Sequence, residues 1–194
     1  IIAYLSTGPL RNFEKIIVSS DKDMYQLLDE KTKIYSLHKK TFVTSESLFE
    51  EFRITSANFA LAKCLCGDVS DNVAGVKGIG FKSVVKKFPI LGNEDPVILD
   101  DLLSYAASHA SEGIIYRRVI EEAEIIKRNW RLVHLDGSML SSDQKKRVDH
   151  VVNTFNTRID KISFVKGLIR EGINDFDTEG FLYDLLCIEG INFS

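Results

Sequence analysis

The stretch that decides the fold runs from Leu65 to Lys82 and reads LCGDVSDNVAGVKGIGFK. Its first half carries two aspartates three positions apart, Asp68 and Asp71, and its second half is the glycine-rich run GVKGIG. Carboxylate pairs prefer hard cations such as Mg²⁺. Glycine turns, in contrast, expose backbone amides that suit phosphate oxygens. A phosphodiester strand is a ligand that both devices could contact at once.

The glycine run matches the pattern of a hairpin that joins two short helices, with Val76 and Ile79 buried beneath it. Lys82, Lys86 and Lys87 fall on one face of the helix that follows, beside the turn. We therefore predict a surface that grips duplex backbone without reading bases. Its predicted residues are Gly75, Val76, Lys77, Gly78, Ile79, Gly80, Lys82 and Lys86. The ordinary alternative is a tight connection between helices with a solvated lysine face.

A second acidic pair, Asp21 and Asp23, follows the apolar run KIIVSS at residues 15–20. This run predicts a strand buried on both faces in a parallel sheet, and the carboxyl ends of such strands collect ligands and catalytic groups. The alternative is that Asp21 caps a helix and Asp23 is a favourable first-turn charge. If the fold brings this pair close to Asp68 and Asp71, mutual repulsion favours a bound cation, and two-metal hydrolysis fits.

The remaining chain predicts an α/β core that passes into helices. Residues 31–44 read as two short strands around His38, and helices are expected from Thr44 or Ser45 and from Thr55 or Ser56 up to Gly67. Three late helices are each preceded by Ser or Asp, and their aromatic residues are expected to pack in a core rather than to stack on bases. The predicted segments are 1–66, the end of the α/β core; 67–90, the metal loop and hairpin; and 91–194, a helical region.

Composition excludes several classes of protein. The chain has 194 residues, 44% of them hydrophobic, and its longest apolar runs fall well short of the roughly 20 residues that cross a bilayer. Three cysteines without a second Cys/His cluster argue against disulfides and structural zinc. We expect a soluble, cytoplasmic protein. Its net charge of −3 hides a local polarity: residues 72–93 hold four lysines and no acid, and residues 171–194 hold six acids and no Lys or Arg.

Two motifs together resemble a known family. IIVSSDKDMYQLL at residues 16–28 and GDVSDNVAGVKGIGFKSVVKKF at residues 67–88 resemble the 5′-nuclease superfamily, which includes flap endonucleases, the 5′-exonuclease domain of bacterial DNA polymerase I and bacteriophage ribonuclease H. The segment RNWRLVHLDG at residues 128–137 is most similar to the T-even-phage type. The resemblance is strong over residues 15–90 and weaker beyond.

The resemblance implies a PIN-like nuclease core in which Asp21, Asp23, Asp68 and Asp71 bind Mg²⁺ or Mn²⁺ and serve catalysis. It also implies a helix-hairpin-helix motif that grips duplex DNA, with K⁺ held by the carbonyls of the hairpin. The implied substrates are a DNA duplex with a 5′ flap or an RNA–DNA hybrid, cut during phage or bacterial replication, with a replication protein as a further partner. No membrane partner is expected.

Family members also have an earlier half, with further acidic residues and a helical arch, that these 194 residues do not contain. The chain opens without Met on IIAYLSTG, which looks like the end of a helix. We therefore expect a fragment with little or no cleavage activity of its own. Two other functions stay open: a non-catalytic DNA-binding module with structural aspartates, and a metal-dependent RNase of the PIN-like type, which generally lacks such a hairpin.

Overall fold

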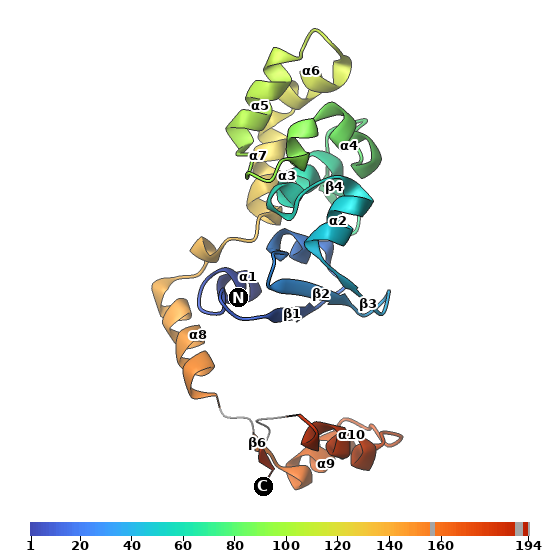
Figure 1. Ribbon diagram of the computed structural model, residues 1–194, viewed down its shortest axis with the longest axis vertical. Helices are drawn as coiled ribbons and strands as arrows, with labels where there is room; N and C mark the ends of the chain where they lie inside the picture. Colours follow the sequence, from blue (N-terminus) through green and yellow to red (C-terminus); the bar gives the residue numbers. More distant parts are fainter. Residues whose placement is uncertain (156–157, 189–191, 194) are drawn as a thin grey trace. The chain divides into compact units, whose positions relative to one another are not determined.

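The computed structural model describes residues 1–155, 158–188 and 192–193 (Figure 1). The chain divides into two compact units, Ile1–Leu140 and Ser141–Ser194. The first unit contains the predicted segments 1–66 and 67–90 together with part of the predicted helical region. No helix among the described residues is long and apolar enough to cross a membrane.

A small mixed sheet lies in the first unit. Strands β1 (Lys15–Val18), β2 (Thr32–Ser36) and β3 (Thr41–Val43) stand in that order, with β1 and β2 parallel and β2 and β3 antiparallel. The register pairs Ile17 with Ile34 and Ile34 with Val43, and all three side chains are buried on one face. The parallel arrangement predicted for this region is confirmed for the β1–β2 pair alone.

The prediction that the first strand is buried on both faces is wrong. Successive side chains of a strand point to opposite faces, and on β1 only Ile17 is buried, whereas Ile16 and Val18 are 61% and 60% exposed. β1 is an edge strand, and the helices α2 to α7 gather on one side of the sheet (Figure 1). The apolar run therefore forms a half-covered strand.

Helix α3 (Ser56–Cys66) is the centre of the first unit. Every residue from Asn58 to Leu65 is buried, because the helix packs against α7 (Ala123–Val133), α4 (Phe81–Lys87), α2 (Ser45–Phe52) and the 3₁₀ helix η1 (Lys22–Leu27). Phe59 stands at this junction, with its ring 5.3 Å from Tyr25, 5.7 Å from Phe52 and 5.5 Å from Phe81. The core of the unit is thus built around one nearly all-apolar helix.

Helices α2 and α3 begin at the residues that the sequence predicts, and α3 also ends where the sequence predicts. Thr44 caps α2 in a reciprocal capping box with Ser47, and Gly67 ends α3 with φ at +73°. Residues 113–130, within the predicted helical region, form two helices, α6 (Ile114–Glu121) and α7, that separate at Glu122. The remaining elements of the unit are α1 (Ile2–Thr7), β4 (Gly67–Asp68), β5 (Val73–Ala74), η2 (Pro89–Gly92), α5 (Leu99–Ser108) and η3 (Gly137–Met139).

The second unit contains the three late helices that the sequence predicts. They are α8 (Ser142–Thr154), α9 (Lys161–Arg170) and α10 (Thr178–Leu186), and the side chains of Ser141, Asp160 and Asp177 cap their first turns. β6 (Arg158–Ile159) pairs in parallel with β7 (Asn192–Phe193). The expectation that the aromatic residues here pack in a core is wrong for Phe155 and Tyr183, which are 72% and 68% exposed. Phe176 and Phe181 pack on each other and on Phe164, with ring centroids 5.3 Å to 6.0 Å apart, although they stay 40% and 38% exposed.

Candidate active site

The first acidic pair lies in a turn between β1 and η1. Asp21 is the N-cap of η1, and its Oδ1 accepts a hydrogen bond of 2.8 Å from the Asp23 amide. The capping role that the sequence left open is therefore confirmed for Asp21. This role does not exclude a second one, because Asp21 is exposed and lines a cleft of about 520 Å³ at the end of the strand.

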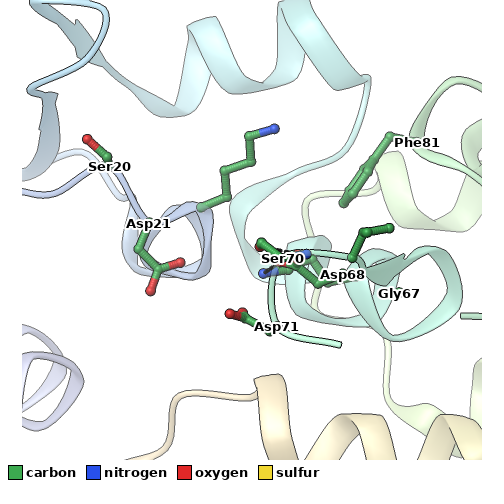
Figure 2. A pocket seen from close by; sticks show the side chains of 10 residues that line it. Ser20, Asp21, Gly67, Asp68, Ser70, Asp71 and Phe81 are labelled. Carbon is green, nitrogen blue, oxygen red and sulfur yellow. Dashed lines mark hydrogen bonds and ion pairs between the residues drawn. The ribbon is translucent and has the colours of Figure 1, made fainter. Parts of the chain in front are cut away.

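The second acidic pair lies in the loop between α3 and the glycine hairpin. Asp68 belongs to the short strand β4, which pairs with β5 across a tight turn, and Asp71 lies in that turn. The backbone amide of Ser70 donates a 2.9 Å hydrogen bond to Asp68 Oδ1, and the Ser70 hydroxyl donates to the same oxygen. Both Asp68 and Asp71 line the same cleft as Asp21, and Figure 2 shows Asp21 facing the loop that carries them.

The two pairs meet on a buried lysine. Lys63 lies on α3 with its side chain 3% exposed, and its ammonium pairs with Asp23 Oδ1 and, at 2.7 Å, with Asp68 Oδ2. One carboxylate from each acidic motif, 45 positions apart in the sequence, is thereby held at a single point. The structure therefore brings the two acidic segments together. The sequence analysis made the metal site conditional on this proximity.

Sequence reasoning did not single out Lys63. It interrupts the apolar run FALAKCLC, and a lysine is almost never fully buried unless it is paired. That interruption, five positions before Asp68, was the available signal. A buried ammonium implies carboxylates around it, but the sequence does not say which ones.

Electrostatics agree with this convergence. Burial raises the pKa of Asp23; Lys63 opposes the rise, and the charges of Asp21 and Asp71 add to it. For Asp68, hydrogen bonds from Lys63 and from Ser70 lower the pKa to about 2. Burial alone would lower the pKa of Lys63, but its hydrogen bonds to the two carboxylates outweigh burial and raise it. The lysine therefore stays charged and both of its partners are drawn to it.

The carboxylate side chains at the cleft are of the chemical type that binds a divalent cation. Asp21, Asp68 and Asp71 line the cleft together with Lys22 and Lys63, and Asp23 pairs with Lys63. The four carboxylates outnumber the two ammonium groups, so negative charge is in excess. Within the described residues, however, no three acidic, histidine or cysteine side chains form a group that could hold a metal ion. The cleft therefore has the ligand chemistry that Mg²⁺ prefers but no complete set of protein ligands.

The glycine hairpin adjoins the acidic loop directly. A Cβ on Gly75 would lie 2.3 Å from the backbone of Cys66, and one on Gly67 would lie 2.3 Å from the amide nitrogen of Gly75. Only glycines allow these two segments to approach so closely. As predicted, Val76 is buried and Ile79 packs against the core. The prediction that the glycine run joins two short helices is not confirmed, because the run connects strand β5 to helix α4 and the nearest earlier helix, α3, ends nine residues before Gly75.

The predicted DNA-binding residues surround this turn. Lys77, Lys82 and Lys86 are exposed, and Gly80 caps α4, where the Ser83 hydroxyl accepts from the Gly80 amide. Gly78 adopts φ at +89°. One hairpin carbonyl, that of Lys77, already accepts a hydrogen bond from Arg118, and the carbonyl of Ala74, just before the hairpin, accepts one from Asn129.

Comparison with known proteins identifies similar sequences. No family model matches the chain. DNA polymerase I of Deinococcus radiodurans is 34% identical over 100 residues, which are 52% of this chain and 10% of the polymerase. A 5′-3′ exonuclease of Buchnera aphidicola subsp. Schizaphis graminum is 37% identical over 81 residues, 40% of this chain and 28% of the exonuclease. Thermostable DNA polymerase I of Thermus aquaticus is 30% identical over 139 residues, 70% of this chain and 15% of the polymerase.

Solved structures share the fold. A mutant of phage T5 5′-exonuclease superposes with a TM-score of 0.58 at 22% identity, over 68% of this chain and 52% of the exonuclease. Phage T5 flap endonuclease, in a pseudo-enzyme–product complex with DNA and metal ions, gives 0.56 at 23% identity, over 68% of this chain and 47% of the endonuclease. The chain thus spans about half the length of these structures. In sequence and fold, it resembles the 5′-nuclease superfamily, as the motifs predict.

Proposed function

We propose that the chain is the metal-loop and DNA-gripping part of a 5′-nuclease, which hydrolyses phosphodiester bonds at 5′ ends or flaps of DNA or of an RNA–DNA hybrid. The observation that carries this proposal is the pairing of Lys63 with Asp23 and Asp68, because it joins two acidic motifs at a cleft next to the glycine hairpin. The sequence relatives and the shared fold support the same reaction class.

In this proposal, Asp21, Asp23, Asp68 and Asp71 supply carboxylate ligands for Mg²⁺ or Mn²⁺. Such ions take one or two carboxylates and complete their coordination with water and substrate phosphate, so a full cage of protein ligands is not required. When bound, the ions would activate water and stabilise the attacking and leaving oxygens. Lys63 holds Asp23 and Asp68 at fixed positions, and its charge limits the repulsion between them.

Duplex backbone would lie along the hairpin and the exposed lysines of α4. Two substitutions test this part: Lys82→Glu with Lys86→Glu should weaken duplex binding and reduce the slope of log affinity against log salt by about one per lost phosphate contact. The charge-matched control is Lys33→Glu with Lys166→Glu, two exposed lysines outside this surface. Equal losses in both double variants would remove the hairpin from the proposal. A K⁺ ion at the hairpin remains a prediction.

The test of the metal site uses the chain itself. Mn²⁺ binding, followed by electron paramagnetic resonance, should be detectable for the unmodified chain and should fall at least about tenfold in Asp68→Asn and Asp71→Asn, because each loses a charged ligand. Asp143→Asn, an exposed first-turn aspartate of α8, is the control and should change nothing. Binding that survives both site substitutions would contradict the metal function.

A second function deserves the same test, a non-catalytic module that holds duplex DNA. The observation that favours it is that the described residues form no complete metal-holding group. Converting the four aspartates to Asn separates the two functions: a binding module keeps its DNA affinity and has no Mn²⁺ uptake to lose. A nuclease loses Mn²⁺ binding together with any Mg²⁺-dependent cleavage of a 5′-flap substrate.

A further inference from the structure

Helix α7 contributes no acidic residue to the cleft, yet both acidic segments are tied to it. The two attachments are side-chain amides. Asn129, on α7, donates to backbone of the α3–hairpin region, and Gln26, in η1, bonds to the end of α7. Neither residue lines the cleft.

Asn129 closes the base of the loop that carries Asp68 and Asp71. It is fully buried, and its amide nitrogen donates to the carbonyl of Cys64 at 3.0 Å and to that of Ala74 at 2.8 Å. Cys64 lies in the last turn of α3, where carbonyls lack helical partners, and Ala74 is the last residue of β5. One side chain thus grips the chain just before the acidic loop and just after it.

The orientation of this amide is determined by its partners. Exchanging its oxygen and nitrogen would set the oxygen against two carbonyl oxygens, so the nitrogen must face them. Asn129 Oδ1 is then buried without a hydrogen-bond donor among the described residues. An unpaired buried acceptor is unfavourable. We infer that the two hydrogen bonds donated by the amide nitrogen offset this cost.

Gln26 makes the corresponding attachment for the first acidic pair. Its amide nitrogen donates to the carbonyls of Asp23 at 2.9 Å and Val133 at 3.0 Å, and its oxygen accepts from the Leu135 amide at 2.8 Å. Val133 is the last residue of α7. The turn that holds Asp21 and Asp23 is therefore fixed to the carboxyl end of this helix.

We propose that Asn129 and Gln26 are positioning residues, which use α7 as a rigid spacer to set the separation of the two acidic pairs. This inference rests on the proposed function for its consequence, metal binding, but not for its geometry. Asn129 and Val133 are four residues apart, a rise of about 6 Å along the helix. A helix cannot change that spacing without breaking its own hydrogen bonds, so the two carboxylate pairs would be held at a fixed separation before any ligand arrives.

The experiment measures two backbone amides by hydrogen exchange and Mn²⁺ affinity by electron paramagnetic resonance, in the full chain. The Val76 amide, bonded to Leu65, reports on the base of the acidic loop, and the Met24 amide, bonded to Asp21, reports on the turn. Asn129→Ala should speed exchange at Val76 about tenfold or more and leave Met24 unchanged. Gln26→Ala should do the reverse. Each should weaken Mn²⁺ binding about tenfold, as loss of supporting hydrogen bonds around metal ligands does elsewhere.

The matched control is Asn58→Ala. Asn58 is also fully buried on α3 and also bonds to backbone, namely to the carbonyls of Asn93 and Asp95 and the amide of Val97, but away from the acidic segments. It should reduce global stability without singling out either amide and without changing Mn²⁺ affinity. Should Asn129→Ala prove too unstable, Gln26→Glu still serves, because it loses both donated bonds, keeps the acceptor for Leu135 and should show the Met24 effect.

The outcomes separate the two proposals. Unchanged exchange at Val76 in Asn129→Ala, or at Met24 in the Gln26 variants, overturns the positioning role. Faster exchange with unaltered Mn²⁺ affinity also overturns the positioning role, since the separation of the two acidic pairs would then have no effect on metal binding. If the unmodified chain takes up no Mn²⁺, the metal function fails, while the exchange pattern still decides whether the two amides hold the two segments.

Discussion

The two units of the chain use helices in different ways. In Ile1–Leu140, helices surround α3 and bury its whole middle portion. In Ser141–Ser194, the described helices are well capped, but Leu182 is the one hydrophobic side chain among the described residues that is buried. Caps determine where a helix begins, whereas packing of an apolar face supplies most of its stability. The first unit therefore has the rigidity that a chemical site needs, and the second has local order with little core.

The largest expected difference between the units concerns a single phenylalanine in each. Phe59→Ala removes a fully buried ring that contacts three other rings and should lower the free energy of unfolding by about 3–5 kcal/mol. Phe181→Ala removes a ring that packs on Phe164 and Phe176 but is 38% exposed, so it should cost less, about 1–2 kcal/mol. Urea unfolding followed by circular dichroism measures both. Similar losses would mean that the second unit has a core comparable to the first.

The next difference concerns one ion-paired lysine in each unit. Lys63→Met leaves Asp23 and Asp68 facing each other and should cost up to about 3 kcal/mol at neutral pH, because removing one member of a buried pair strands the other. Lys161→Met breaks the exposed pair with Glu179 and should cost about 0–1 kcal/mol. The loss in Lys63→Met should shrink in acid, as protonation removes the repulsion. A loss that is independent of pH would argue against the shared carboxylate site.

A smaller effect should appear in the pH dependence of the first unit. Burial lowers the pKa of His134 below its ordinary value, and Asp136 only partly opposes this. As pH falls from 7 through the ordinary histidine range, the unfolded chain takes up the proton first, so stability falls until the folded pKa is passed. His134→Gln should flatten this slope, and His150→Gln, at an exposed position on α8, should not. Thermal unfolding between pH 7 and pH 5 provides the measurement.

The smallest effect is expected from removing the second unit altogether. The single tryptophan, Trp130, lies on α7 in the first unit and stacks on His134 with 4.1 Å between ring centroids, so its fluorescence reports on that unit alone. A chain that ends at Leu140 should unfold, by this probe, within about 0.5 kcal/mol of the full chain, because Ile1–Leu140 is a compact unit with a buried core of its own. Loss of a cooperative transition would show that the first unit depends on the second.

The sequence was most informative where local chemistry decides the structure. Caps at Thr44, Ser141 and Asp160 and the helix end at Gly67 are consequences of backbone groups that need partners, and these are visible in neighbouring residues. The two acidic motifs could be recognised by their residues and by resemblance. Their proximity could not be derived, because it depends on Lys63, and on how α3 and η1 pack.

Predictions from the sequence were wrong where the burial of a side chain depends on an element far away in the chain. Ile16 and Val18 belong to a run that reads the same in an edge strand as in a central one. Phe155 and Tyr183 fall among the apolar positions of the late helices and are nevertheless exposed, because periodicity does not say what covers an apolar face. Asn129 and Gln26 gave no signal at all, because their importance lies in backbone groups far along the chain.

The contact between Gly67 and Gly75 has a mechanical consequence. The two backbones meet with no room for a methyl group. A displacement of the hairpin should therefore move the aspartate loop with it. If the hairpin holds duplex DNA as proposed, bending or sliding of the duplex would displace the carboxylates as well. Alanine at either glycine would force the two segments apart. It would thereby separate the proposed effect of the hairpin on duplex affinity from its effect on the alignment of the aspartates.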